Sequence, residues 1–149
     1  MSEREVRPID ILLADDNEDD IIMIRDAFQD AKLINIVADV RDGEEAIDYL
    51  KRQGKHTDAK PVGLLLLDIN MPRKNGFEVL HEVKNDPKLK HLPVIMLTTS
   101  DREEDIKKSY EEGACSFITK PVSFNKFSEV IKEFSFYWAL ISRIPEDGR

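Results

Sequence analysis

Residues able to bind a metal ion or a phosphoryl group follow several short apolar runs of this sequence. Asp15 and Asp16 follow the first run, Asp68 the third, Thr98 the fourth and Lys120 the fifth. Carboxylates are hard ligands that suit Mg²⁺ or Ca²⁺, and an aspartate can attack phosphorus. Phosphoryl transfer requires positioning and charge neutralisation, which Mg²⁺, a lysine and a hydroxyl group can supply. These residue types together therefore indicate phosphoryl chemistry.

Apolar runs and amphipathic stretches alternate five times along the chain. We expect strands at 9–14, 34–40, 63–67, 93–97 and 115–119, with a helix after each. The run at 63–67 is apolar without alternation, so both of its faces should be buried, as in the centre of a parallel sheet. The order predicts an α/β fold: a five-stranded parallel sheet, flavodoxin-like and doubly wound as (βα)5, with strand order 2-1-3-4-5.

Local signals predict where some helices begin and end. Asp42 followed by Glu45 is typical of a capping box, and Asp101 followed by Glu104 predicts a second helix start. Gly113 predicts the end of that second helix. The polar stretch 51–61 should be a loop.

The carboxyl ends of parallel strands meet at one edge of a sheet, where ligands bind. Each candidate alone has a plainer explanation, since acids can cap a helix or a turn and a lysine can lie on the surface. However, three carboxylates at one edge would raise each other's pKa, and a cation relieves that repulsion. We therefore expect Asp15, Asp16 and Asp68 to meet around Mg²⁺, with Thr98 and Lys120 nearby.

Four motifs resemble those of the receiver domains of two-component response regulators. They are LLADDN at 12–17, LDINMP at 67–72, LTTS at 97–100 and FITKP at 117–121. The resemblance covers roughly residues 9–131. It implies that Asp68 accepts a phosphoryl group from a histidine kinase, so the chain is a signalling domain rather than an enzyme, apart from self-catalysed phosphotransfer and autodephosphorylation.

The resemblance also implies a set of Mg²⁺ ligands. Asp16 is similar to the direct ligand, and Asp15 to the acid that contacts the ion through water. Asp68 contributes its carboxylate, and Asn70 contributes its backbone carbonyl.

Three residues are similar to those that change position on activation. Thr98 resembles the switch hydroxyl, and Lys120 the lysine that pairs with a phosphoryl oxygen. Phe117 stands at the aromatic switch position, where the ring turns inward. The bond between Lys120 and Pro121 resembles the cis bond of the family.

The long 54–61 loop, the LTTS motif and the aromatic C-terminal region are together similar to one subgroup. Its members are stand-alone response regulators that pair with phytochrome-type photoreceptor kinases. The length leaves room for a single receiver domain, expected at 1–144, with a disordered tail at 145–149 and no output domain. Signals would leave by protein–protein contact.

The expected last helix, at 124–141, has an unusual second half. Residues 134–141 are apolar nearly all round, so this end needs a second burial partner. We expect a homodimer or docking on a kinase through it. The alternative is that the N-terminal segment or the long loop covers it.

Composition argues against other classes of protein. Thirty acids against 22 bases give a charge of −8, which disfavours nucleic-acid binding. The charged N-terminus does not resemble a signal peptide, and no apolar stretch is long enough to span a membrane. The single cysteine, Cys115, is expected to be buried and reduced. We therefore expect a cytoplasmic protein.

Two rival functions share these features. One is a phosphatase or phosphotransferase with an aspartate nucleophile, but such enzymes usually carry an acid two residues after it, where this chain has Asn70. The other is a receiver that serves as a scaffold without phosphorylation, which would not need the full set of acids, hydroxyl and lysine.

Overall fold

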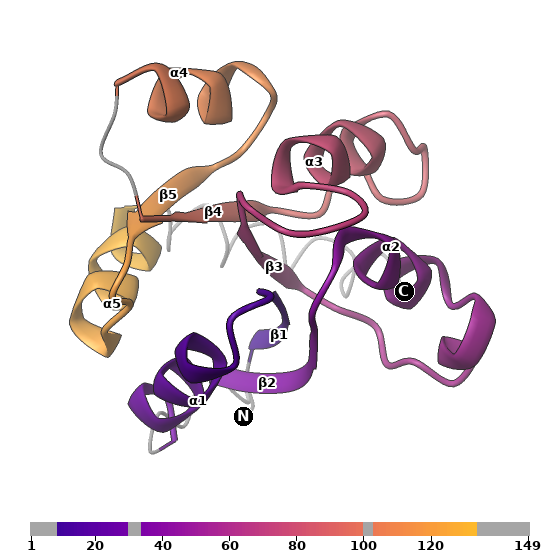
Figure 1. Ribbon diagram of the computed structural model, residues 1–149, viewed down its shortest axis with the longest axis horizontal. Helices are drawn as coiled ribbons and strands as arrows, with labels where there is room; N and C mark the ends of the chain where they lie inside the picture. The colour runs from indigo at the N-terminus through magenta and orange to yellow at the C-terminus, as the bar shows by residue number, and fades with distance from the viewer. Residues whose placement is uncertain (1–8, 30–33, 100–102, 134–149) are drawn as a thin grey trace, which may run out of the picture.

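One parallel sheet forms the centre of the protein. The computed structural model describes residues 9–29, 34–99 and 103–133 (Figure 1). Its strands are β1 (Ile9–Ala14), β2 (Ile34–Val40), β3 (Leu64–Asp68), β4 (Val94–Thr98) and β5 (Ser116–Thr119). Their order is β2-β1-β3-β4-β5, and each neighbouring pair is parallel. The predicted fold class and strand order are confirmed.

Helices cover both faces of the sheet. They are α1 (Glu18–Ala27), α2 (Gly43–Lys51), the short 3-10 helix η1 (Gly54–His56), α3 (Gly76–Lys84), α4 (Glu103–Glu111) and α5 (Phe124–Glu133). Figure 1 shows α1 and α5 on one side of the sheet, and α2, α3 and α4 on the other. This arrangement leaves the carboxyl ends of the strands uncovered by helices.

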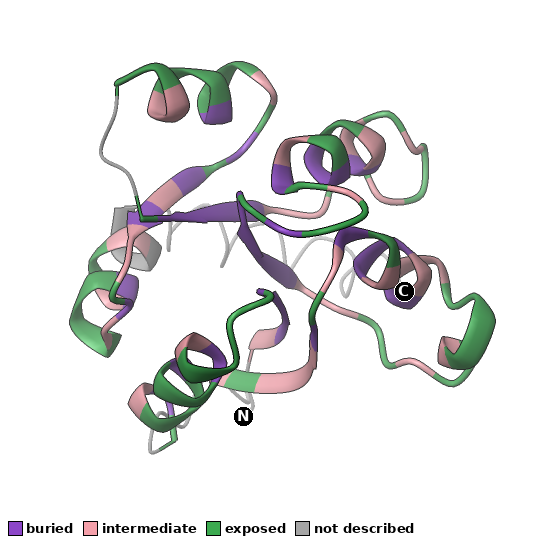
Figure 2. Cartoon of the chain, viewed as in Figure 1, coloured by how far each residue is buried: buried purple, intermediate pink, exposed green. Residues whose placement is uncertain are grey.

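The central strand β3 joins the two halves of the core. Leu65 and Leu67 pack in the cluster that includes residues of α2 and α3, whereas Leu64 and Leu66 pack in the cluster that includes residues of α1 and α5. All four side chains are fully buried, and the central strands are purple in Figure 2. The absence of alternation in this run correctly predicts a strand that is buried on both faces.

Polar side chains define the starts of α2 and α3. Asp42 caps α2, because its side chain accepts the Glu45 N–H at 2.8 Å, which confirms this half of the predicted capping box. The Glu45 carboxylate lies 3.2 Å from Nε2 of His56. Asn75 and Glu78 form a full capping box at α3, with both reciprocal hydrogen bonds. This capping box was not predicted from the sequence.

The Asn75 cap gives a testable stability effect. We expect Asn75→Ala to lower the free energy of unfolding by about 1 kcal/mol, because the Glu78 N–H loses its acceptor. Denaturant unfolding would measure this loss. Gln53→Ala is the matched control, since Gln53 precedes η1 as its N-cap residue but makes no side-chain cap hydrogen bond, and the change should alter stability by less than about 0.5 kcal/mol. Equal losses in the two variants would contradict the assignment.

The predicted burial of Cys115 is wrong. Its side chain is exposed, and β5 begins one residue later, at Ser116. Side chains alternate along a strand, and here Ser116 and Ile118 are buried while Phe117 is half-buried. Because β5 is an edge strand, its apolar run is not enclosed on both sides as β3 is.

Several expectations fall on residues outside the described ranges. These are the Asp101 cap, the apolar segment 134–141 with its proposed dimer contact, and the tail 145–149. The last helix begins at Phe124, as expected, and is described to Glu133. Among the residues that the structure describes, no helix combines the length and apolar character needed to cross a membrane.

Candidate functional site

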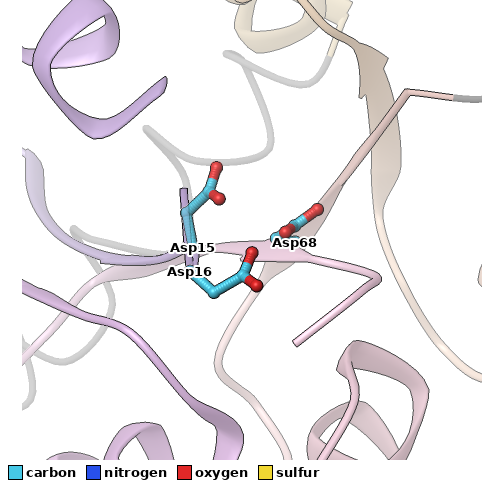
Figure 3. A group of neighbouring side chains, drawn as sticks. All are labelled: Asp15, Asp16 and Asp68. Atoms are coloured by element: carbon cyan, nitrogen blue, oxygen red, sulfur yellow. The ribbon is translucent and has the colours of Figure 1, made fainter. Parts of the chain in front are cut away.

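Three carboxylates meet at the carboxyl ends of the neighbouring strands β1 and β3, as the sequence predicts. Asp15 and Asp16 follow β1, and Asp68 ends β3; the strands are paired in parallel with Ala14 opposite Leu67. Each acid offers one oxygen, and the three oxygens lie within 4.8 Å of one another (Figure 3). This donor set has the chemistry and proximity that a hard divalent cation requires.

Asp15 carries a buried oxygen that lacks a well-formed hydrogen bond. Its side chain is fully buried, and its Oδ1 accepts the Asn17 N–H at 3.0 Å. Its Oδ2 has no partner of acceptable hydrogen-bond geometry among the described residues, although Lys120 Nζ lies 2.8 Å away. Buried carboxylate oxygens need donors or cations, so the residues present fit a metal ion.

The electrostatics at Asp68 favour its neutral form when no metal is bound. Burial, followed by the negative charge of Asp15, raises the pKa of Asp68 to about 7, and the opposing charge of Lys120 only partly compensates. The Asp68 carboxyl is therefore partly protonated near neutral pH in the metal-free protein. A divalent cation beside it would favour the ionised, nucleophilic form.

Lys120 lies among these acids. Its Nζ is 2.8 Å from Asp15 Oδ2, 2.9 Å from Asp20 Oδ2 and 3.5 Å from Asp68 Oδ1. Burial lowers the pKa of Lys120, but its close contacts with the carboxylates of Asp15 and Asp20 outweigh this and hold it above the usual value. The lysine therefore stays charged. The peptide bond between Lys120 and Pro121 is cis, as the resemblance implies.

The other predicted residues lie on neighbouring elements. Thr98 is buried at the end of β4, and its carbonyl accepts the Lys120 N–H at 2.7 Å. Phe117 is half-buried on β5, with its ring edge-on to that of Tyr110 at 6.0 Å between centroids. Asn70 is exposed, two residues beyond Asp68.

Asp20 also contacts this cluster, although the sequence did not predict that it would. It lies in the acidic stretch 15–20, where capping of the following helix is the plainer explanation, and its N–H does donate to the Asn17 side chain at 2.9 Å. Its carboxylate, however, accepts a hydrogen bond from Lys120, 100 residues away in the chain. Asp20 lies in the first turn of α1, four residues after Asp16, which keeps it near the same edge of the sheet, but this spacing alone does not predict the contact with Lys120.

A parallel α/β sheet with acids, a threonine and a lysine at its carboxyl edge defines a response regulator receiver. The chain belongs to the response regulator receiver domain family, whose family model matches residues 11–132. Response regulator Rcp1 of a Synechocystis species is 32% identical over 145 residues, covering 97% of this chain and 99% of Rcp1.

Solved structures agree with this assignment. The phosphorylated cyanobacterial phytochrome response regulator RcpA is 39% identical, with a TM-score of 0.74, over 89% of this chain and 94% of that one. The bacteriophytochrome response regulator AtBRR is also 39% identical, with a TM-score of 0.77, over 87% and 94% of the two chains. Rcp1 itself, in its Mn²⁺-bound form, has a TM-score of 0.72 at 36% identity, over 87% and 94%. The similarity to phytochrome response regulators is thus confirmed.

Proposed function

We propose that this protein accepts a phosphoryl group on Asp68 from a sensor histidine kinase and signals through the resulting conformational change. The observation that carries the proposal is the buried Asp68 carboxylate, which lies beside two further acids and the charged Lys120, whose side chain is only 8% exposed. A carboxylate that only caps a turn would not need these neighbouring charges. The phosphorylated structure of RcpA supports the same chemistry in a relative.

Mg²⁺ is the cofactor that the site fits best. Asp15, Asp16 and Asp68 would hold it, with the backbone carbonyl of Asn70 as a further ligand. Oxygen donors favour Mg²⁺, which keeps positions for water and phosphate oxygens. When bound, it would neutralise charge between the Asp68 carboxylate and the incoming phosphoryl group. The Mn²⁺-bound structure of Rcp1 supports a divalent site in a relative.

The proposed transfer is an in-line displacement at phosphorus. An oxygen of the Asp68 carboxylate attacks the phosphorus of a phosphohistidine, an O–P bond forms, and the P–N bond breaks with its electron pair left on the imidazole nitrogen. Lys120 stays charged, so it can pair with a phosphoryl oxygen as the negative charge moves. The product is an acyl phosphate on Asp68.

Phosphorylation would then bias two neighbouring strand ends. The phosphoryl group adds about −1.5 to −2 charges and new acceptor oxygens next to β4 and β5. Thr98 would move to these oxygens, and Phe117 would turn into the space that Thr98 leaves. The surface beside α4 would change, because the Phe117 ring now contacts Tyr110 of that helix.

A phytochrome-type photoreceptor kinase is the proposed donor. Support comes from RcpA and AtBRR, which are a phytochrome and a bacteriophytochrome response regulator and resemble this chain over most of their lengths. Output would be protein–protein contact, in line with the acidic surface charge.

Phosphoryl uptake tests the proposed function directly. With Mg²⁺ and acetyl phosphate, we expect the protein to gain the mass of one phosphoryl group, stable in acid and labile in base. Asp68→Asn should abolish the gain, because an amide is not a nucleophile toward phosphorus. Asp58→Asn, at an exposed loop position, should be modified like the wild type. A wild type that is never modified, or equal modification of Asp68→Asn, would refute the proposal.

A further inference from the structure

Asp20 holds Lys120 without belonging to the three-carboxylate metal set. The metal set of neighbouring oxygens comprises Asp15, Asp16 and Asp68. Asp20 instead projects from the first turn of α1, and its Oδ2 accepts a hydrogen bond from Lys120 Nζ at 2.9 Å. Lys120 Nζ is closer to Asp20 than to Asp68, at 2.9 Å against 3.5 Å. The resting lysine is therefore drawn toward α1.

A lysine ammonium has three donors, and three carboxylates surround this one. If the proposed function holds, a phosphoryl group on Asp68 brings further acceptor oxygens to the same ammonium. Some existing contact of Lys120 must then weaken.

The exposed fractions indicate which contact weakens. The Asp15 side chain is 0% exposed, so its carboxylate cannot be solvated if Lys120 leaves it, whereas the Asp20 side chain is 26% exposed and can return to water. Releasing a partly exposed carboxylate costs much less than stranding a buried one. Asp20 also carries a negative charge that repels a phosphoryl group placed near Lys120.

We propose that Asp20 competes with the phosphoryl group on Asp68 for the ammonium of Lys120, and so sets how tightly the phosphorylated conformation is held. Asp20 is thus a positioning residue that acts through Lys120. The inference rests on the proposed function, which it extends by a regulating residue on α1.

Fluoroberyllate, which mimics a phosphoryl group on an aspartate, gives an equilibrium test. The full chain is titrated with it at saturating Mg²⁺, and binding is followed by amide NMR. Asp20→Asn removes the charge while keeping the size of the side chain, and we expect it to bind fluoroberyllate about three- to tenfold more tightly than the wild type. Asp19→Asn is the matched control, since it removes one charge from the same exposed turn and should stay within about twofold.

A second measurement reports on the lysine itself. In metal-free protein with ¹⁵N-labelled lysine, the Nζ signal of Lys120 should shift in Asp20→Asn and stay unchanged in Asp19→Asn. If Asp20 had only a structural role, Asp20→Asn would not both shift the Lys120 signal and tighten the binding of fluoroberyllate. Equal affinities for Asp20→Asn and Asp19→Asn, weaker binding by Asp20→Asn, or an unmoved Lys120 signal would each overturn the competition.

The two levels of the proposal fail differently. If the wild type accepts neither a phosphoryl group nor fluoroberyllate, both the proposed function and the competition by Asp20 are refuted. If the wild type accepts both while the two variants behave alike, the proposed function stands and only the role of Asp20 is refuted.

Discussion

Asp68→Asn is expected to make the metal-free protein more stable at pH 8, by about 2–4 kcal/mol, and the gain is expected to vanish near pH 4. The cause is the buried position of Asp68 beside Asp15, which raises the pKa of its carboxyl from the usual 3.8 to about 7. Asparagine has a similar shape and no charge to bury.

The direction of the pH dependence follows from proton binding. Between about pH 4 and pH 7 the folded state keeps a proton on Asp68 that the unfolded state has lost, so the free energy of unfolding falls as pH rises through this window. Above pH 7 the Asp68 carboxyl is ionised in both the folded and the unfolded state, so the full cost of burying its charge lowers the free energy of unfolding. Below pH 4 both are protonated and it disappears. About three units of pKa correspond to about 4 kcal/mol, which sets the upper end of the expected range.

Other acids have lowered pKa values, so they affect the free energy of unfolding in the opposite direction and at lower pH. The pKa of Asp39 is lowered, where burial is outweighed by hydrogen bonds from Arg25 and Arg41, and that of Glu82 is lowered by its hydrogen bond from Lys74. Their stabilisation is lost only as pH falls below the usual carboxyl range. The difference between wild type and variant removes these shared contributions.

Denaturant unfolding at a series of pH values, in the presence of a chelator, measures this effect. Asp58→Asn should leave the pH profile of the wild type unchanged. Added Mg²⁺ should stabilise the wild type and have little effect on Asp68→Asn, since the variant lacks one of the three proposed ligands. A variant that is no more stable than the wild type at pH 8 would show that Asp68 is not strained by its neighbours.

Much of the site could be predicted because it depends on backbone topology. The apolar runs before Asp15 and Asp68 indicate strands, parallel strands share one polar edge, and residues at that edge must meet. No side-chain geometry was needed to bring Asp15, Asp68 and Lys120 together.

The contact of Asp20 with Lys120 and the exposure of Cys115 were not predicted from the sequence, because both depend on the direction in which a side chain points. The carboxylate of Asp20 could serve its own helix or reach across to Lys120, and sequence spacing does not distinguish the two. Likewise, Cys115 lies in an apolar run, but its exposure depends on β5 being an edge strand and on where that strand begins. Such outcomes are decided by tertiary packing rather than by local pattern.

Gly76 is a position where a single methyl group should disturb both the fold and the site. It begins α3, and its N–H donates to the Ile69 carbonyl at 2.7 Å. A Cβ there would lie 2.8 Å from Ile69 Cα and 3.0 Å from the Asp68 carbonyl carbon, with the carbonyl oxygen closer still. These are backbone atoms of the residue proposed to accept the phosphoryl group and of its neighbour, so they cannot turn aside as a flexible side chain would.

We expect Gly76→Ala to lower the free energy of unfolding by about 3 kcal/mol and to slow phosphorylation of Asp68 sharply. Helix propensity alone predicts the opposite sign, since alanine is favoured over glycine in a helix by up to about 1 kcal/mol. The clash must therefore exceed this gain. Gly63→Ala is the control, because its Cβ would meet only the Asp10 carbonyl oxygen, at an ordinary 3.6 Å. Denaturant unfolding of both variants and acetyl phosphate uptake provide the measurements. A stable Gly76→Ala protein with wild-type uptake would mean that α3 can move away from Asp68 without disturbing it.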